Sequence, residues 1–131
     1  MPSKQPDQKK LRHVVVVEDE PDMAELLKEL LEEGGHEVAM AADGLAGLAL
    51  IRATRPDVVV CDLGLPGFDG HDLARAVRED PAIASTRLLA LSGWTRPQDI
   101  ARARESGFDI VLPKPLGVEQ VVGEVERVNS S

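Results

Sequence analysis

Aromatic residues are nearly missing from this chain of 131 residues, which has two Phe, one Trp and no Tyr. A core must therefore be built from aliphatic side chains, mainly Leu, Val and Ala. Cysteine is equally scarce, and the single residue, Cys61, excludes an internal disulfide and cannot by itself form a metal site. We interpret Cys61 as a small buried strand residue, which agrees with a reducing compartment.

Long apolar runs and basic clusters are also absent from the sequence. No apolar stretch comes near the roughly 18 residues that cross a bilayer, and residues 1–10 lack the apolar segment of a signal peptide. The 15 basic and 23 acidic residues give a net charge of −8, and no run of Lys or Arg could follow a phosphate backbone. We therefore expect a cytoplasmic protein that neither spans a membrane nor binds nucleic acid directly.

The length suits one domain, with too few residues for a second. Residues 1–10 are polar and contain two prolines, so we expect a disordered leader there. The domain is expected over residues 11–128, with residues 129–131 as a short tail.

Short apolar runs recur along this domain and predict strands. Residues 14–17 are four valines, and residues 58–61 are three valines and a cysteine; such apolar runs without alternation are typical of a strand buried on both faces of a sheet. Less pure runs stand at 88–91 and 110–112, and a weaker one at 38–42.

Helical patterns separate these runs. The clearest one has apolar residues spaced at three and four positions from Met23 to Leu31, with Pro21 before it and Gly34-Gly35 as a stop signal. Further helices are predicted at residues 45–53, 71–79, 97–106 and 118–125. The last would depend on packing, because its buried face would be made of valines. Strands that alternate with helices indicate a doubly wound α/β protein with a parallel sheet.

Polar residues follow four of the predicted strands. Glu18-Asp19 follows the first strand, and Asp62, Ser92 and Lys114 stand at the ends of the third, fourth and fifth. The carboxyl ends of parallel strands meet at one edge, where ligands bind in such folds. Carboxylates about 5 Å apart would repel by about 3 kcal/mol per pair, so the cluster needs a cation. Mg²⁺ suits these oxygen ligands, while Lys114 and Ser92 suit a phosphoryl group.

Each of these features alone is weak. A Glu-Asp pair before a helix more often compensates the helix dipole, a Lys beside a Pro usually lies at the surface, and a Ser at a strand end is usually a cap. Their order on successive strand ends is the stronger signal.

Four segments in order resemble the receiver domains of two-component signalling. They are VVVVEDEPD at 14–22, DLGLPGFDG at 62–70, LALSG at 89–93 and KP at 114–115. The resemblance covers about residues 11–128. It implies a CheY-like, flavodoxin-type fold, with a five-stranded parallel sheet of order 2-1-3-4-5 and five helices.

The resemblance also implies roles for the acidic residues. Asp62 would be the phosphoacceptor and a Mg²⁺ ligand, Asp19 would bind Mg²⁺ directly, and Glu18 would bind it through water. The backbone carbonyl of Gly64 would be a further ligand. The chain would catalyse only its own phosphorylation and dephosphorylation and would otherwise not be an enzyme.

Two polar residues and a partner complete the implied site. Ser92 would bond a phosphoryl oxygen, and Lys114 would pair with Asp62 and then with the phosphoryl group. The Lys114–Pro115 peptide would be cis. The phosphoryl donor would be a histidine kinase or a histidine phosphotransfer protein, docking near the first helix.

Two positions depart from the family pattern. The family usually has an aromatic residue three positions before the lysine, where this chain has Val111. A switch that works through an aromatic rotamer is therefore in doubt. Pro113, directly before Lys114, removes a backbone donor at the end of the fifth strand.

The three histidines and the single tryptophan could also have functional roles. His13, His36 and His71 are scattered, so we expect surface or capping roles for them. Trp94 stands two residues after Ser92, and we expect it over the mouth of the site. There it would slow the loss of the phosphoryl group by restricting the approach of water.

Two other functions are compatible with a parallel α/β sheet. A small hydrolase or nucleotide-binding enzyme would need a Gly-rich phosphate loop after the first strand, where this chain has the acidic residues 18–22. A receiver-like module that docks without phosphorylation is the alternative that stays open, and phosphorylation by a small-molecule donor would discriminate.

Overall fold

The computed structural model describes residues 11–114 and 118–127, over which strands and helices alternate. The elements are β1 (His13–Val17), α1 (Pro21–Glu33), β2 (Glu37–Ala41), α2 (Gly44–Thr54), β3 (Val58–Asp62), α3 (Gly70–Glu79), β4 (Arg87–Ser92), α4 (Pro97–Ser106), β5 (Ile110–Pro113) and α5 (Val118–Arg127). The expected leader and tail, and the cis peptide at Lys114–Pro115, lie outside the described residues. Every strand and helix predicted from the sequence is present within two residues of its expected bounds.

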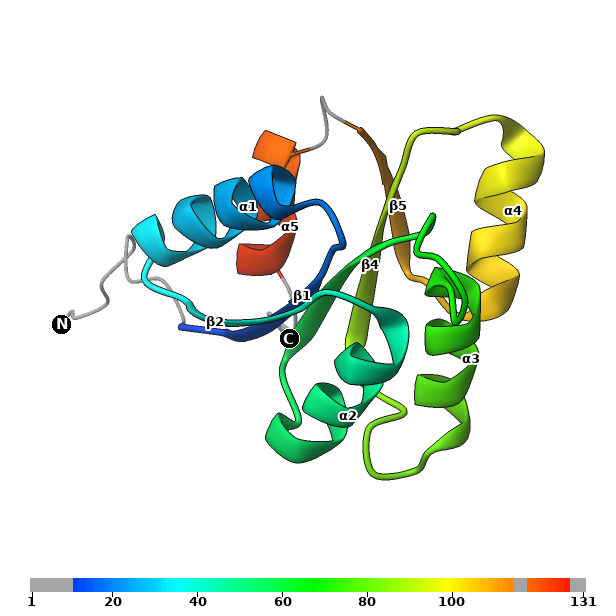
Figure 1. Ribbon diagram of the computed structural model, residues 1–131, viewed down its shortest axis with the longest axis horizontal. Helices are drawn as coiled ribbons and strands as arrows, with labels where there is room; N and C mark the ends of the chain where they lie inside the picture. Colours follow the sequence, from blue (N-terminus) through cyan, green and yellow to red (C-terminus); the bar gives the residue numbers. More distant parts are fainter. Residues whose placement is uncertain (1–10, 115–117, 128–131) are drawn as a thin grey trace, which may run out of the picture.

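The strands form one parallel sheet of order β2-β1-β3-β4-β5, as the resemblance implied. The register aligns Val17 with Cys61 across β1 and β3, and Ser92 with Pro113 across β4 and β5. All strands run in the same direction, so the residues that follow them gather at one edge of the sheet (Figure 1).

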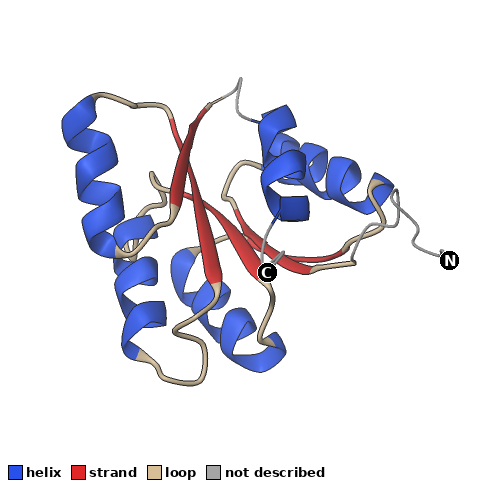
Figure 2. Ribbon diagram, turned by 180° about the vertical axis from the view of Figure 1, so that it is seen from behind, coloured by secondary structure: helices blue, strands red, loops and turns tan. Residues whose placement is uncertain are grey.

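Helices cover both faces of the sheet, and each face has its own aliphatic core. α1 and α5 lie together on one face, and α2, α3 and α4 lie on the other (Figure 2). Val14 and Val16 point to the α1–α5 side, whereas Val15 and Val17 point to the other side. This two-sided burial explains why β1 has no polar alternation. Cys61 is fully buried, as expected.

Capping residues set the starts of the two helices nearest the loop that follows Asp62. The Asp43 side chain accepts a hydrogen bond from the Ala46 N–H at the start of α2. Asp69 and Asp72 form a reciprocal capping box at the start of α3. The loop between β3 and α3 therefore ends at a well-defined helix start.

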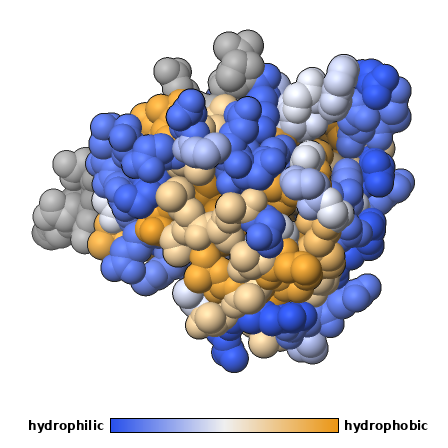
Figure 3. Space-filling model, in the orientation of Figure 1, coloured by the Kyte–Doolittle hydropathy of each residue, from blue (hydrophilic) through white to orange (hydrophobic). Residues whose placement is uncertain are grey.

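The exposed side of α2 is unusually apolar, and Leu45 in its first turn is 63% exposed. Apolar side chains gather over this part of the molecule in Figure 3. Among the described residues, no helix has the length and apolar content needed to cross a membrane.

The prediction of surface or capping histidines is wrong for His36. Its ring is buried beside β1, where Nδ1 accepts a hydrogen bond from the Arg12 N–H at 3.1 Å and Nε2 lies 3.7 Å from Glu126. His13 is exposed, as predicted, and lies 3.1 Å from Glu37.

Candidate functional site

Three carboxylates converge at the carboxyl edge of the sheet. Glu18 and Asp19 follow β1, and Asp62 ends the neighbouring strand β3, so the parallel register brings them together. Each of the three offers a carboxylate oxygen within 4.8 Å of the other two. Glu18 and Asp62 are buried, while Asp19 is exposed. The cluster predicted from the strand ends is therefore present, with an open side at Asp19.

Lys114 brings one positive charge to this cluster. Its Nζ lies 3.0 Å from Asp62 Oδ2 and 3.3 Å from Glu18 Oε1. Pro113 does not displace it, because the Lys114 N–H donates to the Ser92 carbonyl at 2.9 Å and extends the β4–β5 pairing by one residue. β5 thus positions Lys114 beside the carboxylates, although Pro113 lacks a backbone N–H.

The charges of the cluster are unbalanced. Burial raises the pKa of Glu18 from 4.5 to about 7, and the charge of Asp62 adds to this rise against the lowering effects of the Glu20 N–H and Lys114. Burial opposes the charged form of Lys114, but its hydrogen bond to Asp62 and the nearby acids raise its pKa above 10.5. One ammonium group therefore faces more negative charge than it can neutralise.

The Asp62 carboxylate is held at both of its oxygens. Oδ2 meets Lys114, and Oδ1 accepts a hydrogen bond from the Gly64 N–H at 3.0 Å. Gly64 itself is exposed in the turn that follows β3. These two contacts fix the plane of the carboxylate at the edge of the sheet.

The Ser92 hydroxyl is buried at the end of β4 and forms hydrogen bonds within the loop that follows this strand. Its Oγ donates to the Trp94 carbonyl at 2.7 Å and accepts from the Trp94 N–H at 3.0 Å. Bonding a phosphoryl oxygen would require Ser92 to give up its bond to the Trp94 carbonyl. No motif in the sequence predicts this local turn.

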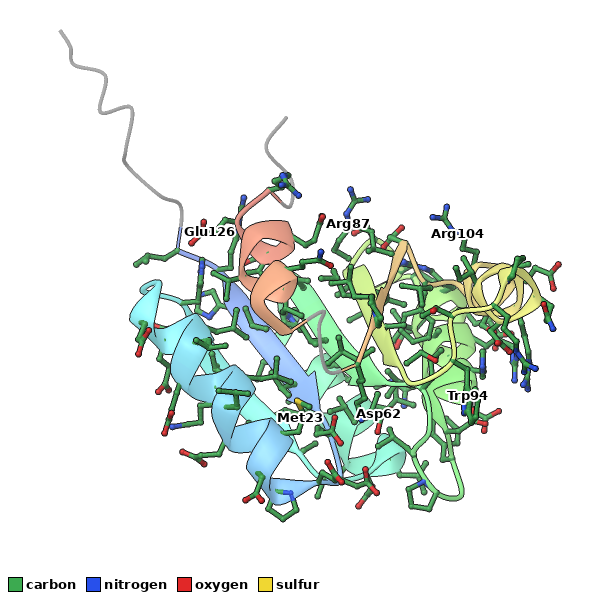
Figure 4. The ribbon with its side chains drawn as sticks, turned by 90° about the horizontal axis from the view of Figure 1, so that it is seen from above. Met23, Asp62, Arg87, Trp94, Arg104 and Glu126 are labelled. Atoms are coloured by element: carbon green, nitrogen blue, oxygen red, sulfur yellow. The ribbon has the colours of Figure 1, made fainter. Side chains whose placement is uncertain are left out.

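An open pocket of about 420 Å³ extends from Asp62 across the ends of β4 and β5. Ser92, Trp94, Arg102 and Lys114 are among its lining residues. Trp94 is 69% exposed, and its indole ring has the Arg96 guanidinium 5.7 Å from its centroid. Figure 4 shows Asp62 and Trp94 at this end of the molecule. The expected position of Trp94 at the mouth of the site agrees with this pocket.

The prediction for His71 is also wrong, because this residue is buried and lines the same pocket. Its Nδ1 lies 2.8 Å from Ser106 Oγ, which donates to the Arg102 carbonyl, so His71 holds α3 against α4. Burial, aided by Arg102, lowers the pKa of His71 below 6.5. The local sequence does not predict this contact, because Ser106 is 35 residues away from His71 along the chain.

Val111, at the position where the family usually has an aromatic residue, is half-buried on β5 and packs against the core beneath α2, α3 and α4. It pairs with Ala90 of β4. Its short, branched side chain has one strongly restricted torsion and no ring to swing between two positions.

A parallel sheet that gathers acids and a lysine at the ends of β1, β3 and β5 defines a class of α/β proteins with a phosphoryl or metal site at the sheet edge. The family model of the response regulator receiver domain matches residues 14–126. The chain belongs to this family, in which phosphorylation-dependent signalling is the standard role.

Two curated relatives illustrate the family at the sequence level. The chain is 34% identical to the DNA-binding response regulator MtrA of Mycolicibacterium smegmatis, over 87% of this chain and 49% of that protein. It is 33% identical to the DNA-binding dual master transcriptional regulator RpaA of Synechocystis sp., over 88% of this chain and 48% of that protein. The chain thus spans about half the length of these relatives.

Solved structures match nearly all of the fold. The chemotaxis protein CheY4 of Vibrio cholerae is 28% identical, with a TM-score of 0.84 over 91% of this chain and 99% of that one. The signal receiver domain of a signal transduction histidine kinase from Syntrophus aciditrophicus is 29% identical, with a TM-score of 0.73 over 92% of this chain and 96% of that one. Receiver domains from different protein architectures therefore share this fold.

Proposed function

We propose that this receiver domain accepts a phosphoryl group on Asp62. The observation that carries the proposal is the arrangement around this carboxylate, with two further acids within 4.8 Å and the Lys114 ammonium 3.0 Å from Oδ2. Asp62 would attack phosphorus and form an acyl phosphate, while the bond from phosphorus to the donor breaks and the donor leaves with its electron pair. Because Gly64 and Lys114 fix the carboxylate, little rearrangement is needed before attack.

We propose Mg²⁺ as the cation of this site. The donors are all oxygens, and the buried Glu18 Oε1 has the Lys114 ammonium at 3.3 Å as its one ion-pair partner among the described residues, while that ammonium is shared with Asp62; a hard divalent ion nearby would supply the missing positive charge. Asp19, Asp62 and the Gly64 carbonyl would bind the ion directly and Glu18 would bind through water. The ion would neutralise charge on the transferred phosphoryl oxygens.

Ser92 and Lys114 would then stabilise the phosphorylated state. Lys114 would exchange its contact with Asp62 Oδ2 for one with the phosphoryl group. Ser92 would donate to a phosphoryl oxygen in place of the Trp94 carbonyl. Both groups are already within the pocket that contains Asp62, which supports these roles.

The same proposal implies a phosphoryl donor and an output partner for the domain. The donor would be a histidine kinase or a histidine phosphotransfer protein in the cytoplasm, and the chain would catalyse only its own phosphorylation and dephosphorylation. The printed names of MtrA and RpaA include DNA binding. For this chain, with a net charge of −8, we propose a protein output partner and no direct contact with nucleic acid. We take the receiver to extend over residues 11–128.

The test is intact mass after incubation with acetyl phosphate and Mg²⁺. The parent should gain one phosphoryl group, and Asp62→Asn should gain none. Omitting Mg²⁺ or adding a chelator should abolish the gain in the parent. An unmodified parent would favour a module that docks without phosphorylation, and equal modification of Asp62→Asn would show that the acceptor lies elsewhere.

A further inference from the structure

The loop that follows Asp62 rests against the first residue of α2. A Cβ atom placed on Gly44 would overlap the carbonyl oxygen of Phe68 and lie 2.9 Å from Phe68 Cδ2. Only glycine therefore lets the helix approach the loop backbone this closely. Gly44 is itself held in place, because the preceding residue, Asp43, caps the helix through its bond to the Ala46 N–H.

This contact matters because the loop has little freedom to absorb a displacement. Leu65 is 3% exposed and belongs to the core beneath α2 and α3, so the middle of the loop is fixed. At its end, a Cβ on Gly70 would lie 2.8 Å from Leu63 Cα and 2.9 Å from the Asp62 carbonyl oxygen. Because Leu65 is anchored, a shift at Phe68 is passed instead through the nearby Gly70 to the backbone of Asp62 and Leu63, where the turn to Gly64 begins.

That turn orients the Asp62 carboxylate. The Gly64 N–H donates to Asp62 Oδ1 at 3.0 Å, so moving Gly64 would also turn Asp62. The same residue carries the carbonyl that we propose as a Mg²⁺ ligand. Displacements well below the length of a bond are enough to matter, since about 1 Å of misplacement can cost about a hundredfold in rate.

We propose that Gly44 is a positioning residue for phosphoryl transfer at Asp62. It lets α2 hold the 62–70 loop by its backbone, and so keeps Gly64 and Asp62 in their reactive orientation. The inference rests on the proposed function. Among the described residues that form the acid cluster or line its pocket, none lies on α2, so the contribution of this helix is indirect.

Gly47 supplies a matched control one turn further along α2. A Cβ on Gly47 would lie 2.8 Å and 3.0 Å from the two methyl groups of Val17, and no loop atom is among its nearest neighbours. Gly→Ala does not lower the helix propensity at either position, so loss of intrinsic helicity cannot explain a defect in either variant. Gly47→Ala crowds side chains of the core, whereas Gly44→Ala presses on the loop backbone.

The test compares the two variants in two measurements. The first is amide hydrogen exchange at Gly64, which needs neither metal nor phosphoryl donor. The second is the rate of phosphorylation by acetyl phosphate at saturating Mg²⁺. Gly44→Ala should speed Gly64 exchange and slow phosphorylation by about tenfold each. Gly47→Ala should leave both within about twofold, although it lowers the stability of the fold.

A second variant, Phe68→Ala, keeps the test decisive if Gly44→Ala does not fold. Phe68→Ala removes the ring that packs on Gly44 and leaves α2 unchanged, and it should also speed Gly64 exchange by severalfold. Unchanged exchange and phosphorylation in folded Gly44→Ala would overturn the inference, as would equal effects of Gly44→Ala and Gly47→Ala. If Gly44→Ala does not fold, unchanged exchange in Phe68→Ala overturns it. A parent that cannot be phosphorylated defeats the proposed function, while the exchange measurement still decides the role of Gly44.

Discussion

The two ends of the sheet carry ion clusters that are balanced in opposite ways. At the amino ends of β4 and β5, Arg78 lies 2.9 Å from Asp109, and its remaining N–H groups donate to the carbonyls of Gly107, Ala84 and Thr86. The Asp109 carboxylate also accepts a bond from the backbone of β4. Each charge here has a partner, and the cluster joins three segments of the chain.

At the carboxyl ends, by contrast, Lys114 is the one described residue that forms ion pairs with the carboxylate cluster of Glu18, Asp19 and Asp62. One of these acids has its pKa raised to about 7, which is a measure of the free energy that its charge costs there. The different charge balance at the two ends indicates where this small domain stabilises its fold and where it gives up stability. The neutralised end stabilises the fold, and the unbalanced end is the place where we propose that a cation and a phosphoryl group bind.

The largest expected effect on stability comes from removing Arg78 from the balanced ion cluster at the amino ends of β4 and β5. Arg78→Ala would leave three backbone carbonyls without this donor and would remove the 2.9 Å ion pair of Asp109, which would keep only the Leu88 N–H and the more distant Arg87; we expect a loss of about 3 kcal/mol in the free energy of unfolding. Arg75 lies on the same helix and is about half exposed, so Arg75→Ala should cost about 0.5 kcal/mol. Urea denaturation of both variants measures the two losses, and equal values would show that the Arg78 cluster has no special role.

A second prediction concerns the unbalanced end and its dependence on pH. The pKa of Glu18 is higher in the folded state than its ordinary 4.5, so between these values the folded protein binds more protons than the unfolded one. In Mg²⁺-free buffer, stability should therefore fall as pH rises from about 5 to 8, by up to about 2–3 kcal/mol.

The control for this prediction is Glu18→Gln, which cannot titrate at this position. The difference in unfolding free energy between the parent and this variant should change with pH, while contributions from His71 and other groups cancel. A difference that stays constant from pH 5 to 8 would contradict the assignment of the charge cost to Glu18.

The smallest effect is expected at the open mouth of the unbalanced end. Trp94 is mostly exposed, so Trp94→Ala should change stability by less than about 0.5 kcal/mol. If the indole restricts the approach of water to the acyl phosphate, phosphorylated Trp94→Ala should lose its phosphoryl group a few-fold faster than the parent. The decay of the phosphorylated mass over time measures this rate. An equal or longer half-life would rule out shielding by Trp94.

Most of the fold could be predicted from local patterns. β1 and β3 contain continuous runs of valine because both of their faces are buried, and α1 has a regular apolar stripe with a proline start and a glycine stop. The order of the strands followed from the resemblance to receivers, because periodicity alone does not specify which strands are neighbours.

The candidate site was predictable where residues follow strands, since topology alone brings those positions together. The buried histidines were not, because His36 and His71 acquire their partners from segments 24 and 35 residues away. The same reason hides the ion pair of Arg78 and Asp109, which are 31 residues apart. Close backbone contacts such as the one at Gly44 have no signature in the sequence beyond the glycine itself.

We propose that the carboxyl end of the sheet gives up stability that a divalent cation restores. The most direct test of this proposal is the free energy of unfolding at pH 8, measured by urea denaturation with increasing Mg²⁺ for the parent and for Asp19→Ala. We predict a rise in the parent that reaches about 2.7 kcal/mol at a hundred times the dissociation constant, and little or no rise in Asp19→Ala. A parent whose stability does not respond to Mg²⁺, or an Asp19→Ala variant that responds equally, would contradict the account.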